Sequence, residues 1–176
     1  MIPRPIPLVP NFDCFPNVLT TLPNWVLWSY ELKNGKYTKV PKRPCGQNAS
    51  TTDPDTWRSF DIVRTTYPRG GFDGVGIVLT GMPIRNELYL IGMDFDHCLT
   101  AGVLDEDPRQ AVDKLDTYSE ISPSGEGIRL FLLHDKIIPA RKRNVDGKSR
   151  EIYSSSRYLT VTGHTFGDAR EVRHVP

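Results

Sequence analysis

The sequence has few of the features that mark specialised classes of protein. None of its apolar stretches approaches the ~20 residues that a membrane-spanning helix needs, and residues 1–7 lack the apolar core and cleavage site of a signal peptide. No internal repeat and no low-complexity tract is present. These absences favour a water-soluble globular domain without a membrane partner.

Cysteine and net charge are also scarce. The three cysteines (Cys14, Cys45 and Cys98) are scattered, odd in number and outside any zinc spacing, which favours a reducing, cytoplasmic compartment over a disulfide-stabilised secreted protein. The 22 basic and 21 acidic residues give a net charge of only +1. Overall charge therefore does not indicate a nucleic-acid-binding protein.

The charge is nevertheless unevenly distributed along the chain. Residues 141–150 hold five basic residues and one aspartate, whereas residues 105–120 hold six acidic and two basic residues. This pattern predicts one face that attracts polyanions and one that repels them. A flexible basic loop without a partner is the alternative.

The strongest local signal is residues 88–96, an apolar run of β-forming residues that ends in two aspartates. Side chains alternate along a strand, so Asp94 and Asp96 are predicted to share one face. Two neighbouring carboxylates at the end of a buried strand repel each other unless a cation lies between them. Mg²⁺ and Mn²⁺ prefer such oxygen ligands. The alternative is a pair of exposed aspartates in a turn.

Other elements follow from periodicity and turn residues. Asn34-Gly35 predicts a hairpin between strands 25–32 and 36–40, and the strand at 74–80 is predicted to form a second hairpin with the Asp94 strand. Asp53-Pro54 and Asp107-Pro108 are typical helix starts. Further strands are predicted at residues 128–133, 150–153 and 157–164, after a proline-rich arm at residues 1–23.

Two segments have the composition of phosphate-binding loops. Lys39, Lys42 and Arg43 lie in a proline-stiffened segment that could hold a phosphate or form a solvated loop. Residues 122–127 are small and glycine-rich and lead into a strand, so their backbone N–H groups could hold anionic oxygens. Arg129 could reach forward from this strand as a phosphate fork. A plain surface loop is the alternative.

Seven short motifs occur in a characteristic order. They are WxxW (25–28), KxxKVPK (36–42), ASTTDPxTW (49–57), GVGIVLT (74–80), GMDFDHC (92–98), YSExSPSGEG (118–127) and REIYxxxRYLTVTGH (150–164). In this order they resemble the primase-polymerase domain of phages and plasmids, within the archaeo-eukaryotic primase superfamily. The resemblance covers about residues 24–165.

The resemblance implies an α+β fold with an RRM-like antiparallel catalytic sheet, flanking helices and a small N-terminal α/β subdomain, with the active site in the cleft between the halves. Residues 24–176 would form the catalytic domain. The family's first motif maps onto Asp94 and Asp96, and its third motif onto Glu151. These three residues would be catalytic and would hold two divalent ions, Mg²⁺ or Mn²⁺.

The family's second motif usually ends in a histidine that contacts the nucleotide's phosphates, and Arg129 stands at that position here. Arginine can bind a triphosphate but cannot titrate near neutral pH as histidine does. The implied nucleotide-binding residues are Ser122, Ser124, Gly125, Gly127, Arg129, Arg157 and His164. The implied contacts to template or primer are Lys39, Lys42, Arg43, Arg141, Lys142, Arg143 and Lys148.

The function expected from the resemblance is template-dependent nucleotidyl transfer by a DNA primase or DNA polymerase, in phage or plasmid replication inside a bacterial or archaeal host cell. Its partners would be a single-stranded DNA template, a primer and nucleoside triphosphates, and a helicase or helical primase domain can accompany such a domain in the full-length protein. Two alternatives stay open. One is a non-catalytic DNA-binding replication-initiator module, which Arg129 favours, and the other is a metal-dependent nuclease.

Overall fold

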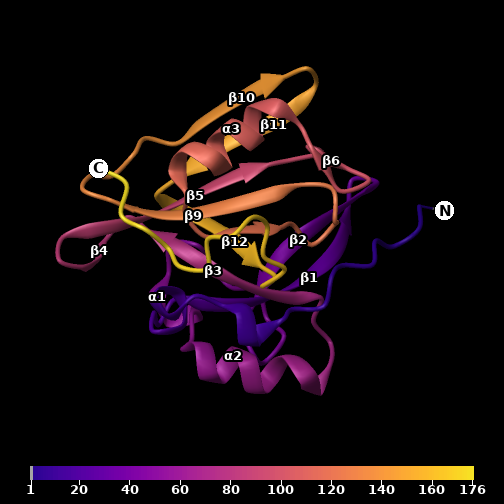
Figure 1. Ribbon diagram of the computed structural model, residues 1–176. Helices are drawn as coiled ribbons and strands as arrows, with labels where there is room; N and C mark the ends of the chain where they lie inside the picture. Colours follow the sequence, from indigo (N-terminus) through magenta and orange to yellow (C-terminus); the bar gives the residue numbers. More distant parts are fainter. Residues whose placement is uncertain (1) are drawn as a thin grey trace.

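The computed structural model describes residues 2–176, and it contains two larger β-sheets, each with a helix beside it (Figure 1). Helix α3 (Glu106–Leu115) lies beside the upper sheet in this view, and α2 (Phe60–Thr66) lies below the lower sheet. The strand pairs within the sheets are antiparallel and the helices are few and short. The chain is therefore mixed α+β, as the sequence predicted.

The lower sheet, here sheet A, has the strand order β12-β3-β1-β2. Its strands are β1 (Trp25–Lys33), β2 (Lys36–Lys42), β3 (Gly74–Thr80) and β12 (Ser155–Val161). The predicted hairpin at Asn34-Gly35 is confirmed, because β1 pairs with β2 and both turn residues have a positive φ, 51° and 75°. This combination is typical of the type I′ turn that matches the twist of paired strands.

The upper sheet, here sheet B, has the order β10-β11-β5-β9-β8, with β4 paired to the start of β5. Its strands are β4 (Pro83–Arg85), β5 (Leu88–Phe95), β8 (Ser119–Ile121), β9 (Ile128–His134), β10 (Arg141–Val145) and β11 (Lys148–Tyr153). The remaining elements are η1 (Phe12–Cys14), α1 (Asn17–Thr20), η2 (Pro54–Thr56), η3 (Tyr67–Arg69), β6 (Leu99–Thr100) and β7 (Val103–Leu104).

The predicted hairpin between residues 74–80 and the Asp94 strand is wrong. Strand β3 pairs with β1 and β12 in sheet A, whereas β5 pairs with β4, β9 and β11 in sheet B. The chain does reverse direction between β3 and β5, but the strand that pairs with β5 across this turn is the short strand β4. The strands that do pair with β3 lie far from it in the sequence.

An apolar layer joins the two sheets. Leu90, Phe131 and Leu133 of sheet B are buried in one cluster with Leu79 and Leu159 of sheet A. A Cβ at Gly92 would collide with the Leu159 side chain and would lie 3.2 Å from Leu79 Cδ1. Glycine at this position therefore permits the close approach of the sheets.

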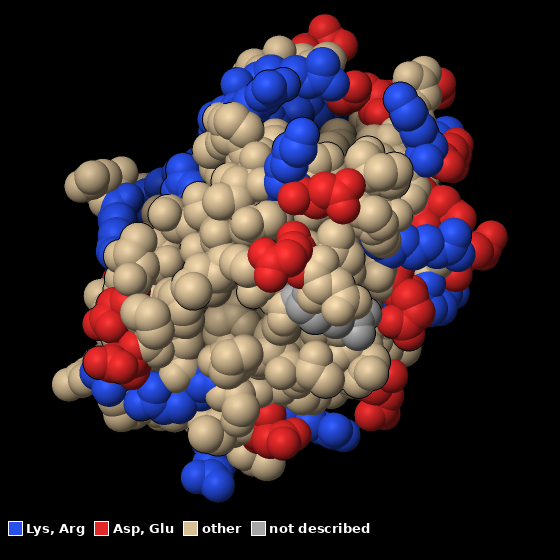
Figure 2. All heavy atoms as spheres, turned by 90° about the vertical axis from the view of Figure 1, so that its left-hand side faces the viewer, with Lys and Arg blue, Asp and Glu red and all other residues tan. Residues whose placement is uncertain are grey.

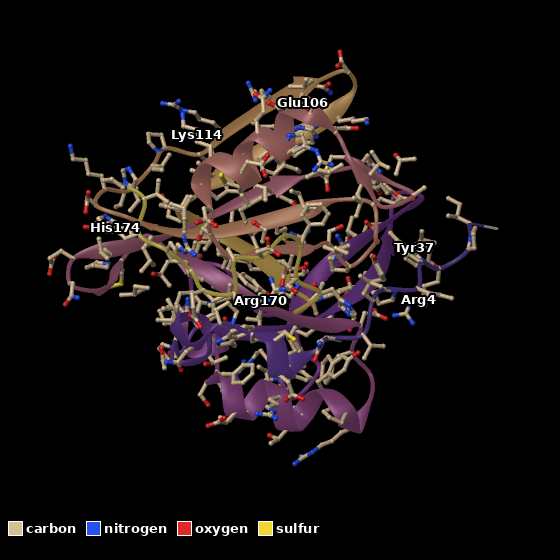
Figure 3. All side chains as sticks on the ribbon, viewed as in Figure 1. Arg4, Tyr37, Glu106, Lys114, Arg170 and His174 are labelled. Carbon is tan, nitrogen blue, oxygen red and sulfur yellow. The ribbon has the colours of Figure 1, made fainter. Side chains whose placement is uncertain are left out.

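The opposite face of sheet B packs on α3. Met93, Phe95 and Leu130 belong to a second cluster, which Val112 and Leu115 of α3 complete. Figure 3 labels Glu106 and Lys114, from the first and last turns of this helix. Strand β5 thus directs alternate residues to sheet A and to α3, as its sequence pattern predicts.

The chain crosses from one sheet to the other near its C-terminal end. Strand β11 ends at Tyr153 in sheet B, and β12 begins at Ser155 in sheet A. Sheet A is consequently built from both ends of the chain. The resemblance implied a small subdomain near the N-terminus, but this sheet also contains the C-terminal strand β12. Trp25 and Trp28 are buried in sheet A, as expected for core residues.

The N-terminal segment lies against later parts of the chain. The backbone N–H of Leu8 donates to the Pro123 carbonyl at 2.9 Å, and that of Asn11 donates to the Thr162 carbonyl at 2.8 Å.

Within residues 2–176, no helix combines the length and apolar character that crossing a membrane requires.

Candidate active site

Five charged residues lie in one line across sheet B. Lys142, Glu151, Asp94, Arg129 and Glu120 occupy directly opposite positions on β10, β11, β5, β9 and β8. Opposite residues in antiparallel strands project from the same face, with Cβ atoms roughly 4.5–5.5 Å apart. The register therefore brings together Asp94 and Glu151, which lie 57 residues apart in the sequence (151 − 94 = 57). These five residues are called the charged row below.

Asp94 and Arg129 form the centre of the charged row. Arg129 Nε lies 3.0 Å from Asp94 Oδ1, and the two side chains are only 3% and 14% exposed, respectively. The contact is an ion pair without hydrogen-bond geometry, since neither of these two atoms has a hydrogen-bond partner among the described residues. The Arg129 guanidinium instead donates through Nη1 to the hydroxyl of Thr160 on β12.

Asp96 follows directly after β5 and shares the negative charge of Asp94. Burial raises the pKa of the Asp96 carboxyl, and the charge of Asp94 raises it further, while Arg129 and Lys39 oppose the shift. The backbone N–H of Asp96 donates to the Ser149 carbonyl on β11 at 3.1 Å, which holds the residue beside the third acid. A cation near this pair would relieve the repulsion between the two carboxylates.

Glu151 is held by three donors. Its carboxylate accepts hydrogen bonds from Ser149 Oγ at 2.9 Å, from the Tyr153 hydroxyl at 2.6 Å and from the Lys142 ammonium. Burial acts to raise the pKa of Glu151, but these hydrogen bonds outweigh burial and lower the pKa below its ordinary value. Glu151 and Tyr153 share one face of β11, as the alternation of the strand predicts.

The small-residue loop 122–127 packs against the end of β5. A Cβ at Gly127 would lie 2.5 Å from the Phe95 carbonyl oxygen and 3.4 Å from Asp96 Cα, so only glycine fits between them without displacement. Ser122 N donates to the Gly127 carbonyl at 2.8 Å and Gly125 N to the Ser122 carbonyl at 2.9 Å. The loop is therefore a closed turn placed beside the aspartates.

Comparison with curated proteins gives a relative with a named activity. Over 163 residues the sequence is 34% identical to the "DNA Primase-polymerase" of Nitratiruptor phage NrS-1. The match covers 89% of this chain and 21% of the phage protein. The chain is homologous to a segment of a phage DNA primase-polymerase. The resemblance seen in the seven motifs is thereby confirmed, although no family model matches the sequence.

Lys39 faces the acids of this primase-polymerase homologue from the other sheet. It lies on β2 opposite Tyr30, and its backbone carbonyl accepts a hydrogen bond from the Tyr158 hydroxyl at 2.7 Å. Burial lowers the pKa of Lys39 to about 8, the charge of Arg129 lowers it too, and Asp94 and Asp96 act to raise it. Its surroundings thus include these two carboxylates and Arg129.

Glu120 is a site-adjacent residue that sequence reasoning missed. Its carboxylate is fully buried and accepts hydrogen bonds from the Tyr118 hydroxyl at 2.8 Å and from the backbone N–H groups of Thr162 and Gly163, each at 3.0 Å. Burial raises its pKa, and the hydrogen bonds act in the opposite direction. The sequence did contain a signal for this residue, because Glu120 is an acid in a short strand that leads directly into the glycine-rich loop at residues 122–127.

Other predicted phosphate ligands make contacts with residues outside the charged row. Arg157 is exposed, and its guanidinium carbon lies 4.9 Å from the centre of the Tyr153 ring. His164 Nε2 lies 2.8 Å from the Val9 carbonyl oxygen, so this side chain contacts the N-terminal segment. Lys42, at the end of β2, pairs with Glu31, and Arg43, which follows the strand, lies 3.5 Å from Gln47 Oε1.

The acidic and basic segments are not separate faces, and that prediction is wrong. Arg143 lies 2.7 Å from Asp107, and Lys148 lies 2.6 Å from Asp105. Arg150 contacts Asp105 at 3.5 Å and Asp107 at 2.9 Å. Pairing between the β10–β11 hairpin and the start of α3 therefore neutralises much of this charge. A window of sequence cannot show it, because the two segments lie about 40 residues apart.

Basic side chains still gather at the surface over β10. Figure 2 shows them at the top of the molecule, with acidic side chains beside them. A cavity of about 630 Å³ lies here and is lined in part by Arg141, Lys142, Arg143 and Glu151. Arg141 has no ion pair among residues 2–176.

The acids suit divalent ions in type and in position. Asp94, Asp96 and Glu151 are hard oxygen donors on adjacent strands, and Asp94 Oδ1 is buried without a hydrogen bond. Within residues 2–176, however, no three His, Cys, Asp or Glu side chains are gathered closely enough to hold an ion. The Asp94 and Glu151 carboxylates contact Arg129 and Lys142 instead.

Proposed function

We propose that this chain is a template-dependent nucleotidyltransferase domain, a DNA primase, a DNA polymerase or both, which joins nucleoside triphosphates to a 3′-hydroxyl during phage or plasmid replication. The observation that carries the proposal is the register that sets Glu151 directly opposite Asp94. Asp96 and the loop at residues 122–127 lie at the end of the same strand. The homology to part of a phage primase-polymerase supports the same activity.

The proposed catalytic and metal-binding residues are Asp94, Asp96 and Glu151, with Mg²⁺ or Mn²⁺ as the bound ions. A pair of such ions, when bound, stabilises the attacking and leaving oxygens of phosphoryl transfer. The role of the three carboxylates is to hold the ions, and those on β5 and β11 have neighbouring strand positions from which to do so. Lys39 supplies positive charge from the opposite sheet.

The loop at residues 122–127 is the proposed binding site for the triphosphate. The hydroxyls of Ser122 and Ser124, and the backbone N–H groups that do not already donate within the loop, can donate to phosphate oxygens. The contact of Gly127 with the end of β5 places these donors next to Asp96. Gly125, Arg157 and His164 complete the proposed nucleotide-binding set, and Arg129 is considered separately below.

Single-stranded template and primer are the proposed macromolecular partners. The β10–β11 hairpin carries Arg141, Lys142, Arg143 and Lys148, and β2 with the residue that follows it carries Lys39, Lys42 and Arg43. Binding through such residues releases counterions from the phosphate backbone and therefore weakens as salt rises. We further propose that sheet B is the RRM-like catalytic sheet. In this sheet the chain runs from β5 through α3 to β8 and β9.

One assay tests the enzymatic activity directly. The purified chain would be incubated with a labelled oligonucleotide template, with or without primer, with dNTPs or NTPs, in Mg²⁺ or Mn²⁺. Wild-type protein should extend the primer or make a new one, and Asp94→Ala should not. Asp113→Ala, which removes an exposed acid from α3, is the matched control and should retain full activity.

A non-catalytic DNA-binding module is the second candidate. It is favoured by the ion pairs that Asp94 and Glu151 already make with Arg129 and Lys142. This candidate predicts that wild-type protein incorporates no nucleotide and that DNA binding survives Asp94→Ala. Shortening of the labelled strand with metal alone would instead support the nuclease that the sequence left open.

A further inference from the structure

Arg129 lies deep in the junction between the two sheets. Its side chain is 3% exposed, and it stands between Asp94 and Glu120 in the charged row. A guanidinium removed from water needs compensating charge and hydrogen-bond acceptors. The structure supplies both, through the two carboxylates and through Thr160 on β12.

Thr160 belongs to the edge of sheet A that has no strand partner. Among residues 2–176, strand β12 pairs with β3 alone, so its other edge presents backbone groups that must find partners elsewhere. The Thr160 carbonyl and the Thr162 N–H point to the same edge, because they lie two residues apart on an extended chain. Arg129 Nη1 lies 3.4 Å from the Thr160 carbonyl oxygen, and Glu120 accepts from Thr162 N–H at 3.0 Å.

Two neighbouring members of the charged row therefore fasten this edge to sheet B. The same guanidinium that holds Thr160 through Nη1 faces Asp94 through Nε. Its planar, rigid fork holds both partners in a fixed geometry, which the flexible stem and compact ammonium of a lysine do not impose. The position of the Asp94 carboxylate is thus coupled to the edge of β12.

We propose that Arg129 is a positioning residue that orients Asp94 for metal binding by anchoring it to the edge of β12, and that it does not bind the nucleotide's phosphates. The inference rests on the proposed function, because it assigns Asp94 to the metal site. To reach a phosphate, Arg129 would have to leave Thr160 and withdraw its charge from Glu120, which is fully buried, and from Asp94, which is 14% exposed. Removing one partner of a buried ion pair is strongly unfavourable.

Arg129→Lys tests the proposal while the positive charge is kept. Binding of Mn²⁺ without nucleotide would be measured from the electron paramagnetic resonance signal of the free ion, and steady-state incorporation would be measured on a primed template. Groups that orient metal ligands typically contribute about 10- to 100-fold in metal affinity. We expect the Kd for Mn²⁺ to rise about 10-fold and the KM for the nucleotide to stay within about twofold of wild type.

Thr160→Val gives a second, independent variant. It removes the hydroxyl that accepts from Arg129 but keeps the size and the β-branched shape of the side chain. It should weaken Mn²⁺ binding in the same direction as Arg129→Lys but by less. The double variant should be no weaker than Arg129→Lys alone, because both changes break one chain of contacts.

Two controls keep a folding defect apart from the expected effect. Arg109→Lys makes the same exchange at an exposed arginine on α3 and should leave both constants unchanged. Far-ultraviolet circular dichroism and thermal melting would establish that each variant is folded. If Arg129→Lys does not fold, the same comparison is made with Thr160→Val.

The outcomes separate this inference from the proposed function. A raised KM for the nucleotide with unchanged Mn²⁺ binding would show a direct phosphate contact and overturn the inference. Unchanged values of both constants would overturn it as well. If Mn²⁺ binding by the wild-type protein depends on Asp94 and on Arg129 but the protein incorporates no nucleotide, the proposed function fails and the inference stands.

Discussion

The two ends of the layer between sheets A and B are built from the same strands but by different physical means. At one end β5 and β9 present Leu90, Phe131 and Leu133 to the apolar side chains of sheet A. At the other end the same strands present Asp94 and Arg129 to Thr160 and Lys39. Continuing a strand by a few residues thus changes its role from packing to chemistry.

The comparison shows how the energetics of the two ends differ. Apolar burial stabilises the fold in proportion to the area removed from water and has no strict directional requirement. Buried charges stabilise little in net terms, because desolvation offsets their attraction, but they are strongly directional. We therefore expect substitutions at the apolar end to change mainly stability and substitutions at the charged end to change mainly activity.

Asp96→Asn should give the largest effect on activity. Nucleotide incorporation should fall on the order of 10³-fold, which corresponds to about 4 kcal/mol of lost transition-state stabilisation. The free energy of unfolding should not fall, because burial and the charge of Asp94 already raise the pKa of this carboxyl, so the ionised form is disfavoured in the fold. Primer extension and urea denaturation measure the two quantities. A large loss of stability with full activity would break the comparison.

Phe131→Ala should produce the opposite result. This fully buried side chain lies in the apolar layer, and removing a buried aromatic side chain typically costs about 3–5 kcal/mol of stability. Incorporation per folded molecule should stay within about threefold of wild type. The milder Phe131→Leu serves as the control and should lose less stability. If Phe131→Ala abolished activity in a well-folded protein, the two ends could not be treated as separate.

Much of the fold was readable because its signals are local. The apolar run of β-forming residues located β5 and placed Asp94 and Asp96 at its end, and Asn34-Gly35 specified the β1–β2 hairpin. The motif resemblance pointed to Glu151, and the strand register places it opposite Asp94. In each case a few neighbouring residues, or a pattern shared with relatives, contain the information.

The errors have a common physical cause, which is pairing between distant segments. Nothing in residues 74–80 shows that β3 joins sheet A, because that choice depends on β1 and β12. The ion pairs between Asp105, Asp107 and the β10–β11 hairpin likewise form only once the chain folds. Glu120 was missed because the backbone N–H groups that its carboxylate accepts from, beside the edge of β12, come near it only when the chain folds.

Arg141→Ala should have a smaller effect, confined to DNA binding. Removing one phosphate-binding side chain should reduce the slope of log K against log[salt] by about 1, and Arg141 has no ion pair among residues 2–176 to compete with phosphate. Lys148→Ala is the matched comparison and should reduce the slope by less, since Lys148 is already paired with Asp105 at 2.6 Å. Fluorescence anisotropy with single-stranded DNA at several salt concentrations measures both slopes. Equal reductions would show that the ion pairs open on binding.

Glu120→Gln should give the smallest effect, one that appears as a change with pH. Burial raises the pKa of Glu120 above its value in the unfolded chain. The folded state therefore keeps this proton to higher pH than the unfolded state does, and the stability that Glu120 contributes declines as pH rises above the ordinary range for glutamate. Glutamine has no such proton, so the stability of the variant relative to wild type should improve with rising pH.

Urea denaturation of both proteins at several pH values between 4 and 8 would measure this difference. Glu126→Gln, which changes an exposed side chain, corrects for the loss of one surface charge. If the stability of Glu120→Gln instead fell relative to wild type as pH rose, the hydrogen bonds from Thr162, Gly163 and Tyr118 would outweigh burial. The negative charge of Glu120 would then stabilise the folded state, and the charged end of the layer would contribute to stability as directly as the apolar end does.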